Sequence, residues 1–147
     1  MIKDIIEKWE NNKDKLENFF KENNQEVYDD YTKIVKNIIH YIVNEGKNKS
    51  DDFGLYDIDK IHEINDGDYQ GTLIFIIPMD TYQPSLHEYI YTSVYYGSCS
   101  GCDTLQSIQY GSDNYGNGKP TKEQVKDYML LSLNIIQNMR YFKEVEY

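Results

Sequence analysis

Apolar residues recur at helical spacing through the first third of the chain. In residues 2–22 they fall three or four positions apart, with a polar gap at Asn12 and Lys13, which predicts an amphipathic helix. A second, wider stripe runs over about 25–45 and ends at Gly46, a residue type that commonly terminates helices. We therefore expect an N-terminal helical pair over residues 1–46. The second stripe comprises Val27, Tyr28, Tyr31, Ile34, Val35, Ile38, Ile39, Ile42 and Val43.

The period then changes from helical to alternating, which is typical of strands. Residues 55–64 predict a first strand, although the alternation slips near Lys60 and Ile61. Residues 65–68, Asn-Asp-Gly-Asp, predict a hairpin turn because Asp-Gly tolerates the positive φ of tight turns. The continuous apolar run over 69–77 predicts a central strand that is buried on both faces.

Residues 89–96 predict a third strand with two different faces. Ile90, Thr92, Val94 and Tyr96 share one face, which we expect to join the core. The opposite face is a ladder of aromatic and small residues, and the pattern leaves its role open. It would face solvent, pack on a helix or form a binding surface. The ladder consists of Tyr89, Tyr91, Ser93 and Tyr95.

Capping signals mark two further helices after the third strand. Asp103 is placed to cap the N-terminus of a short helix through Ile108. After a loop at 111–118, Thr121 and Gln124 match a capping box that opens a long final helix within 119–140. Residues 141–147 alternate and predict an edge strand or a frayed end.

The order of elements predicts an α+β fold. We expect an antiparallel sheet of three to four strands covered by helices, namely two N-terminal helices and one long C-terminal helix. Residues 1–147 are expected to form a single domain, since 147 residues suffice for one core. In this domain the sheet and the turn after it occupy 55–110.

The negative charge is concentrated in the middle of the chain. The formal net charge is −10, and residues 51–118 carry eleven carboxylates but one basic residue, Lys60. Nine of the fifteen tyrosines lie in the same segment. Nucleic-acid binders usually carry a basic stripe, so we expect no direct nucleic-acid binding. An acidic, tyrosine-rich surface suits a basic protein partner, a cation or mimicry of a polyanion, or it only keeps the domain in solution.

Two sequence features bear on location. No apolar run approaches the roughly 20 residues that a membrane-spanning helix needs. The first residues mix charged and apolar side chains and lack the apolar region of a signal peptide. We therefore expect a cytoplasmic protein without membrane contact.

The two cysteines form a CxxC motif at Cys99 and Cys102. With His62 and His87 they would complete a four-ligand zinc site, but the histidines lack the usual paired spacing, and no metal or cofactor is expected. The motif lies between a strand and a helix start, as in thiol-redox proteins, although its neighbours are neutral or acidic. A cysteine nucleophile with His62 or His87 as base, oriented by Asp68 or Asp103, is a third alternative. The fourth is a tight turn with small buried cysteines.

A ligand site is also expected where the tyrosine ladder meets this turn. Exposed NH groups in a Gly- and Ser-rich turn form a nest that can hold an anion such as a phosphate or carboxylate. Tyrosine rings beside it could stack a planar group. The candidate ligand-binding residues are Tyr69, Gln70, Tyr91, Tyr95, Gly97, Ser98, Cys99, Ser100, Gly101, Cys102, Asp103, Thr104 and Gln106.

Three motifs carry a resemblance to a known group of proteins. GDYQGT at 67–72, TYQPS at 81–85 and YYGSCSGCDTLQ at 95–106 resemble a signature of small uncharacterised proteins encoded by bacteriophages. The likeness covers about residues 60–138, including TKEQVKDYM at 121–129, and leaves out the N-terminal helices. The resemblance implies a viral setting inside the cytoplasm of an infected bacterium. It implies no catalytic residues.

These observations give three functional hypotheses. The first is a non-enzymatic phage accessory protein that binds a host protein or a small ligand, as takeover and counter-defence proteins do. The second is a cysteine-dependent enzyme, or a thiol-redox or zinc protein, that uses the CSGC turn. The third is a virion-associated structural protein. Neither the partner nor the oligomeric state follows from the sequence.

Overall fold

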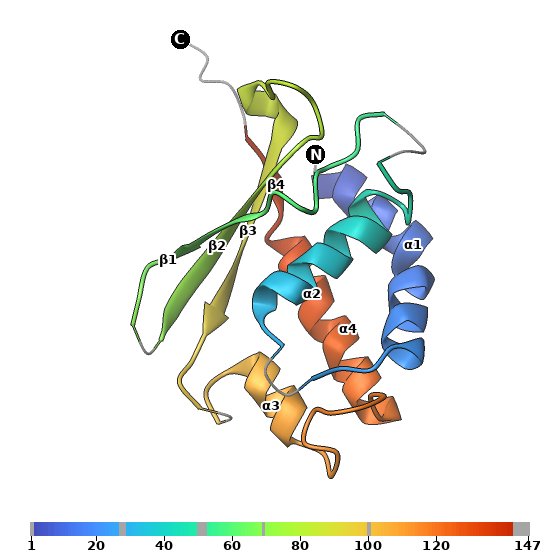
Figure 1. Cartoon of the computed structure of the whole chain (residues 1–147), viewed down its shortest axis with the longest axis vertical. Coiled ribbons are helices and arrows are strands. Elements are labelled where there is room, and N and C mark those ends of the chain that lie inside the picture. The colour runs from blue at the N-terminus through green and yellow to red at the C-terminus, as the bar shows by residue number, and fades with distance from the viewer. Residues whose placement is uncertain (1, 27–28, 50–52, 69, 100, 143–147) are drawn as a thin grey trace.

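In the described parts of the chain, four antiparallel strands form the sheet, in the order β1-β2-β3-β4. They are β1 (His62–Asn65), β2 (Gly71–Pro78), β3 (Tyr89–Tyr96) and β4 (Arg140–Tyr141). The structure is a computed structural model that describes residues 2–26, 29–49, 53–68, 70–99 and 101–142. The long helices lie together on one side of this sheet (Figure 1), so the predicted α+β fold is confirmed.

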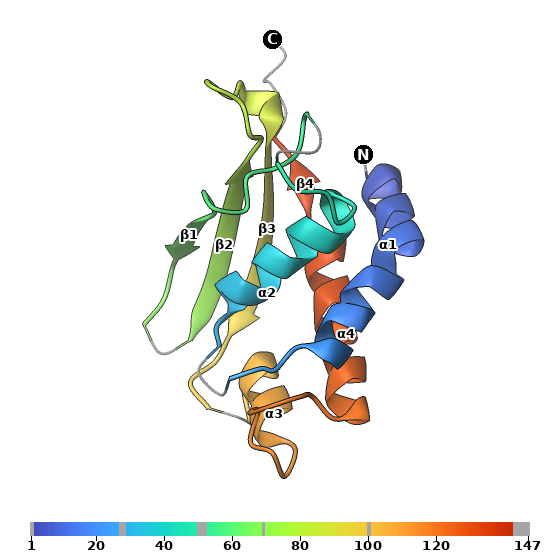
Figure 2. The ribbon, with the colours of Figure 1, turned by 45° about the vertical axis from the view of Figure 1, so that its right-hand side comes forward.

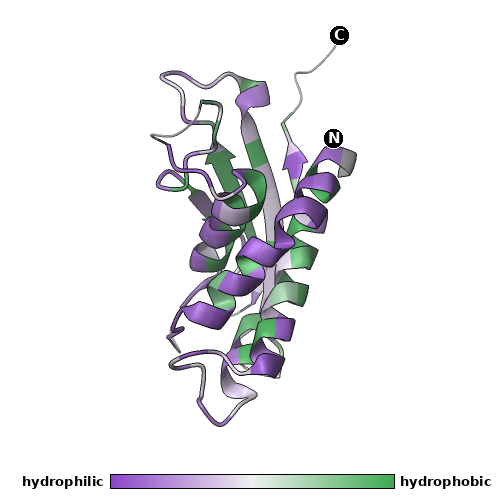
Figure 3. Cartoon of the chain, turned by 90° about the vertical axis from the view of Figure 1, so that its right-hand side faces the viewer, coloured by the Kyte–Doolittle hydropathy of each residue, from purple (hydrophilic) through white to green (hydrophobic). Residues whose placement is uncertain are grey.

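The helices form two further layers. They are α1 (Ile2–Glu22), α2 (Tyr31–Ile38) with one π-helical turn (Ile39–Val43), α3 (Thr104–Tyr110) and α4 (Lys122–Gln137). α4 lies against β3, where the buried Thr92 hydroxyl donates to the carbonyl of Ile135 at 2.8 Å. α1 packs on α4 and on the π-helical turn, away from the sheet (Figure 2). Figure 3 looks onto this helical side, where α1 turns a largely hydrophilic surface outward.

The core lies between the sheet and these helices. Its side chains come from the N-terminal helices, the strands and the C-terminal helix, so all three predicted segments share one cluster. The rings of Phe20 in α1 and Tyr128 in α4 stack with centroids 4.9 Å apart. The largest fully buried side chains are Tyr128, Phe20, Phe75, Ile5, Leu16, Ile34, Ile38, Ile39, Ile42, Ile77, Ile90 and Ile135.

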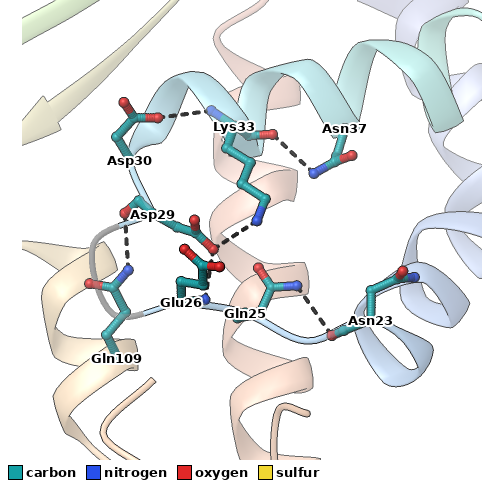
Figure 4. Close-up of polar contacts among 8 residues, drawn as sticks. All are labelled: Asn23, Gln25, Glu26, Asp29, Asp30, Lys33, Asn37 and Gln109. Atoms are coloured by element: carbon teal, nitrogen blue, oxygen red, sulfur yellow. Dashed lines mark hydrogen bonds and ion pairs between the residues drawn. The ribbon is translucent and has the colours of Figure 1, made fainter. Parts of the chain in front are cut away.

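The second helix begins at Tyr31, later than the expected start near residue 25. The backbone of Gln25 pairs with that of Gly118, donating at 2.8 Å and accepting at 3.0 Å. Asp30 then caps α2, because its side chain accepts from the Lys33 amide at 3.1 Å (Figure 4). The apolar period extends upstream of α2, but tertiary pairing and a cap set where the helix starts. Val27 and Tyr28 of the predicted stripe lie outside the described residues.

The first strand is shorter than predicted, since β1 begins at His62 instead of residue 55. Tyr56 forms only an isolated bridge with Met79. The buried Asp57 then turns the chain, because its side chain accepts from the Asp59 amide and its carbonyl accepts from the Lys60 amide. This Asp-centred turn is the physical cause of the slip in the alternating pattern.

The central position of β2 is confirmed, but its burial on both faces is wrong. Leu73, Phe75 and Ile77 are buried toward the helices, whereas Ile74 and Ile76 on the other side are half-buried. No helix among the described residues covers that second side, as Figure 1 shows. We call it the outer face of the sheet. An apolar run can thus belong to a strand with one uncovered face.

Most of the remaining predictions for the C-terminal half agree with the structure. The third strand coincides with β3, and Thr121 and Gln124 form the expected capping box at the start of α4. β4 is an edge strand, but it shares only Tyr141 with the range 141–147 for which an edge strand or a frayed end is predicted, and residues 143–147 lie outside the described residues. Across the described parts of the chain, none of the helices has the length and apolar character needed to cross a membrane.

Candidate functional site

The turn after β3 is organised around the carboxylate of Asp103, which is buried. One oxygen accepts from the Gly97 amide at 2.8 Å. The other accepts from the Gln106 amide at 3.0 Å, which confirms the predicted N-cap of α3. Asp103 therefore closes the turn by binding the backbone at both of its ends.

Tyr31 at the start of α2 completes this network. Its hydroxyl donates to Asp103 Oδ1 at 2.9 Å and accepts from the Leu105 amide at 3.1 Å. Burial is the main reason why the pKa of Tyr31 is raised above its usual range. The same region is tied to the α1–α2 loop, because the Gln109 side chain donates to the carbonyl of Asp29 at 3.0 Å (Figure 4). The turn and α3 are thus tied to the start of α2 and the loop just before it, which lie 72 to 80 residues away in sequence.

Gly97 is required by the close approach of the chain to itself. A Cβ at this position would lie 2.4 Å from the carbonyl oxygen of Cys102 and 2.8 Å from its sulfur. At Gly101 the nearest atom to an added Cβ is Cys99 Sγ, at 3.9 Å. The two glycines of the turn therefore have different roles, and only Gly97 is sterically constrained.

The two cysteines face each other at the surface. Both are free and exposed, and their sulfurs lie 2.7 Å apart. The Cys99 amide donates to Cys102 Sγ at 3.1 Å. Hydrogen bonding from the Cys99 thiol is the largest of several effects that lower the pKa of Cys102. The prediction that these residues are small buried hydrophobes is wrong for both.

The backbone NH groups of the turn are largely bound by its own chain. Those of Gly97 and Cys99 bind Asp103 and Cys102, and those of Cys102 and Asp103 donate to the carbonyl of Cys99 at 3.1 and 2.9 Å. An anion would have to compete with these contacts, which argues against the expected anion nest. Ser100 lies outside the described residues.

Neither candidate histidine lies beside the cysteines. His87 is in the 3₁₀ turn (Leu86–Glu88) before β3, and Cys99 follows β3, so a strand of roughly 26 Å separates them. His62 belongs to β1 opposite Ile76 and also lies away from the CSGC end of β3. Among the described residues there is no group of three or more His, Cys, Asp or Glu that could hold a metal. The geometry therefore supports neither the zinc site nor a Cys–His pair.

The expected ligand site divides into two regions. Gln70, Tyr91 and Tyr95 lie on or beside the outer face, where the Tyr95 hydroxyl donates to the Gln70 side chain at 3.4 Å. The other described candidates lie in the turn or at the start of α3, and Tyr69 lies outside the described residues. In the turn region Ser98, Gly101 and Thr104 are exposed, whereas Gln106 is half-buried and donates to the carbonyl of Gly97 at 3.4 Å.

Two hollows on the helical side were missed by the sequence interpretation. One, of about 630 Å³, lies between α1 and α4 and is lined in part by Trp9, Lys126 and Leu130. The other, of about 460 Å³, lies beside Cys102 and shares Leu130 with the first. One residue in the sequence could have indicated these hollows, because Leu130 is an apolar residue of α4 that lies outside the buried stripe of the helix.

No protein-family model, curated protein or solved structure matches this chain.

Proposed function

We propose that this chain is a bacteriophage accessory protein that binds a basic host protein through the outer face of its sheet. The observation that carries the proposal is an apolar and aromatic sheet face without a helical cover. On this face Ile64 is 48% exposed and Tyr95 is 54% exposed. Exposed apolar patches on small proteins commonly mark interaction sites.

The register of the strands places the side chains of the outer face in two rows across the sheet. One row joins Ile64, Ile74 and Ser93, and the other joins His62, Ile76, Tyr91 and Arg140. The ring of Phe142 extends the second row, with its centroid 4.8 Å from that of Tyr91. Tyrosine suits such a surface because it supplies a large contact area and a polar hydroxyl with few rotatable bonds.

The charge around this face selects the chemistry of the partner. Asp66 and Asp68 are exposed in the turn between β1 and β2, whereas the exposed Glu63 lies opposite Phe75 and so on the helical side of β1. They belong to the segment that carries nearly all of the net negative charge. A partner with an apolar surface and a basic rim would complement both features, and electrostatic attraction would raise its association rate.

The biological setting in this proposal rests on the resemblance to phage-encoded proteins. It implies action in the cytoplasm of an infected bacterium, by takeover of a host factor or by counter-defence. Binding of this kind needs neither a metal nor a bound cofactor.

The test is quantitative affinity purification from phage-infected bacterial cells that express the tagged chain. Ile64→Ser and Tyr95→Ser alter the outer face, and Leu130→Ser is the matched control on α4, where the leucine is 53% exposed. We expect a basic protein that co-purifies with the wild type and the control, is lost with both outer-face variants and dissociates as salt rises. A partner that both outer-face variants retain, or recovery with virus particles alone, would contradict the proposal.

A further inference from the structure

We infer that Cys99 and Cys102 form a redox-active dithiol that exchanges with cationic disulfides. The proposal rests on the geometry of the pair and on the hollow beside it, and it is independent of binding by the outer face. The sulfurs are 2.7 Å apart, whereas a disulfide bond is about 2.0 Å long. To form a disulfide bond, the two sulfurs therefore need to approach each other by less than about 1 Å.

The turn holds the two cysteines in this position, and the buried Tyr31 supports it through Asp103. Asp103 fixes both ends of the turn, and the sulfurs stay at the surface where a second molecule can reach them. Thiol–disulfide exchange needs an exposed attacking sulfur and a second thiol placed to resolve the mixed disulfide. Exposed cysteines three residues apart in a fixed turn meet both conditions.

The contacts of the pair assign a different role to each sulfur. Cys102 Sγ accepts a hydrogen bond from the Cys99 amide and lies within hydrogen-bond distance of Cys99 Sγ, and these contacts stabilise its thiolate. Cys102 attacks one sulfur of an incoming disulfide, forms a mixed disulfide and releases the other half as a thiol. Cys99 then loses its proton and attacks Cys102 Sγ, which releases the second half. Two protein thiols are oxidised to one disulfide, and the incoming disulfide is reduced to two thiols.

The hollow beside Cys102 indicates the class of disulfide. It has a volume of about 460 Å³, and Ile108 and Leu130 supply apolar lining. Among its described lining residues the charged ones are Asp103 and Asp127, and none is basic. An anionic disulfide would be repelled there and a cationic one attracted.

The test compares three disulfides of different charge: cystamine (cationic), 2-hydroxyethyl disulfide (neutral) and oxidised glutathione (anionic). Mass spectrometry of the intact chain follows the reaction. With cystamine the wild type should lose two hydrogens without a lasting adduct, and dithiothreitol should restore both thiols. Cys99→Ser should trap a mixed disulfide on Cys102. Cys102→Ser should react at least about tenfold more slowly, because the better stabilised thiolate is gone.

The reaction rates should fall from cystamine to 2-hydroxyethyl disulfide to oxidised glutathione. Asp127→Asn should reduce the preference for cystamine over the neutral reagent by about two- to fivefold. If both thiols of the wild type stay free in the presence of cystamine, or if Cys99→Ser and Cys102→Ser react equally fast, the proposal of a redox-active pair is wrong. Faster oxidation by oxidised glutathione than by cystamine would overturn the cationic preference. Circular dichroism of each variant establishes that it is folded.

Discussion

The hydroxyl of Tyr31 donates to Asp103 Oδ1 at 2.9 Å across 72 residues of sequence. This buried contact joins the first residue of α2 to the cap of α3. Through the same carboxylate it reaches Gly97 at the end of β3. The CSGC turn is therefore fixed by a tertiary contact as well as by its local sequence.

Tyr31→Phe removes this contact and should destabilise the fold. The Leu105 amide and one oxygen of Asp103 would lose a partner in a buried site, which costs about 1–3 kcal/mol. Urea unfolding followed by circular dichroism measures the change. Tyr95→Phe is the control, because it removes an exposed hydroxyl at 3.4 Å from Gln70 and should leave stability unchanged. Equal midpoints for the two variants would show that the Tyr31–Asp103 contact contributes nothing.

The two glycines of the turn should respond differently to alanine. Gly97→Ala places a Cβ against the backbone of Cys102, so the turn must open, at a cost of about 1–3 kcal/mol. In Gly101→Ala the added Cβ would contact only Cys99 Sγ, at 3.9 Å, so this substitution should be tolerated. Thermal unfolding of both variants gives the comparison. A Gly97→Ala protein as stable as Gly101→Ala would mean that the close approach at Gly97 relaxes without cost.

Some elements could be predicted from the sequence because local and tertiary signals agree. In β3 the alternating pattern matches the two environments of the sheet, with Thr92 buried and Tyr95 exposed. In α4 the capping box of Thr121 and Gln124 marks the start. Asp103 was identified as a cap because its partner is three residues away.

Other features depend on contacts between distant residues, and no local pattern reports them. The start of α2 depends on pairing of Gln25 with Gly118, and the late start of β1 on the turn around Asp57. Tyr31 looked like an ordinary member of an apolar stripe, so its bond to Asp103 could not be anticipated. The apolar run of β2 predicts two buried faces, because such a run does not reveal whether a second layer covers the strand.

Thr92→Val tests the connection between the sheet and α4. The Thr92 hydroxyl is fully buried and donates to the carbonyl of Ile135, so a valine of similar shape loses only this hydrogen bond. We expect a loss of about 1 kcal/mol in the free energy of unfolding. Thr72→Val, at a half-buried site opposite Tyr95, is the control and should change stability little. An equal loss in both variants would point to threonine replacement in general instead of this bond.

Buried tyrosines should make the protein unstable at high pH. Burial raises the pKa of Tyr56 and Tyr128 to about 12, and it raises the pKa of Tyr31 and Tyr141 as well. Each group binds its proton more tightly when folded than when unfolded. Their contribution to stability is therefore complete below about pH 10, where unfolded tyrosine ionises, and is lost as the pH rises through the folded values.

Urea midpoints measured between about pH 8 and pH 12 should fall steadily above about pH 10. Ultraviolet absorbance of tyrosinate should show that the exposed tyrosines ionise first and that the buried tyrosines ionise only as the chain unfolds. Tyr128→Phe removes one of the buried groups and should flatten the decline. Tyr82→Phe, at a residue that is 96% exposed, should leave it unchanged. If the decline is equally steep in Tyr128→Phe and the wild type, ionisation of this buried ring does not contribute to alkaline unfolding.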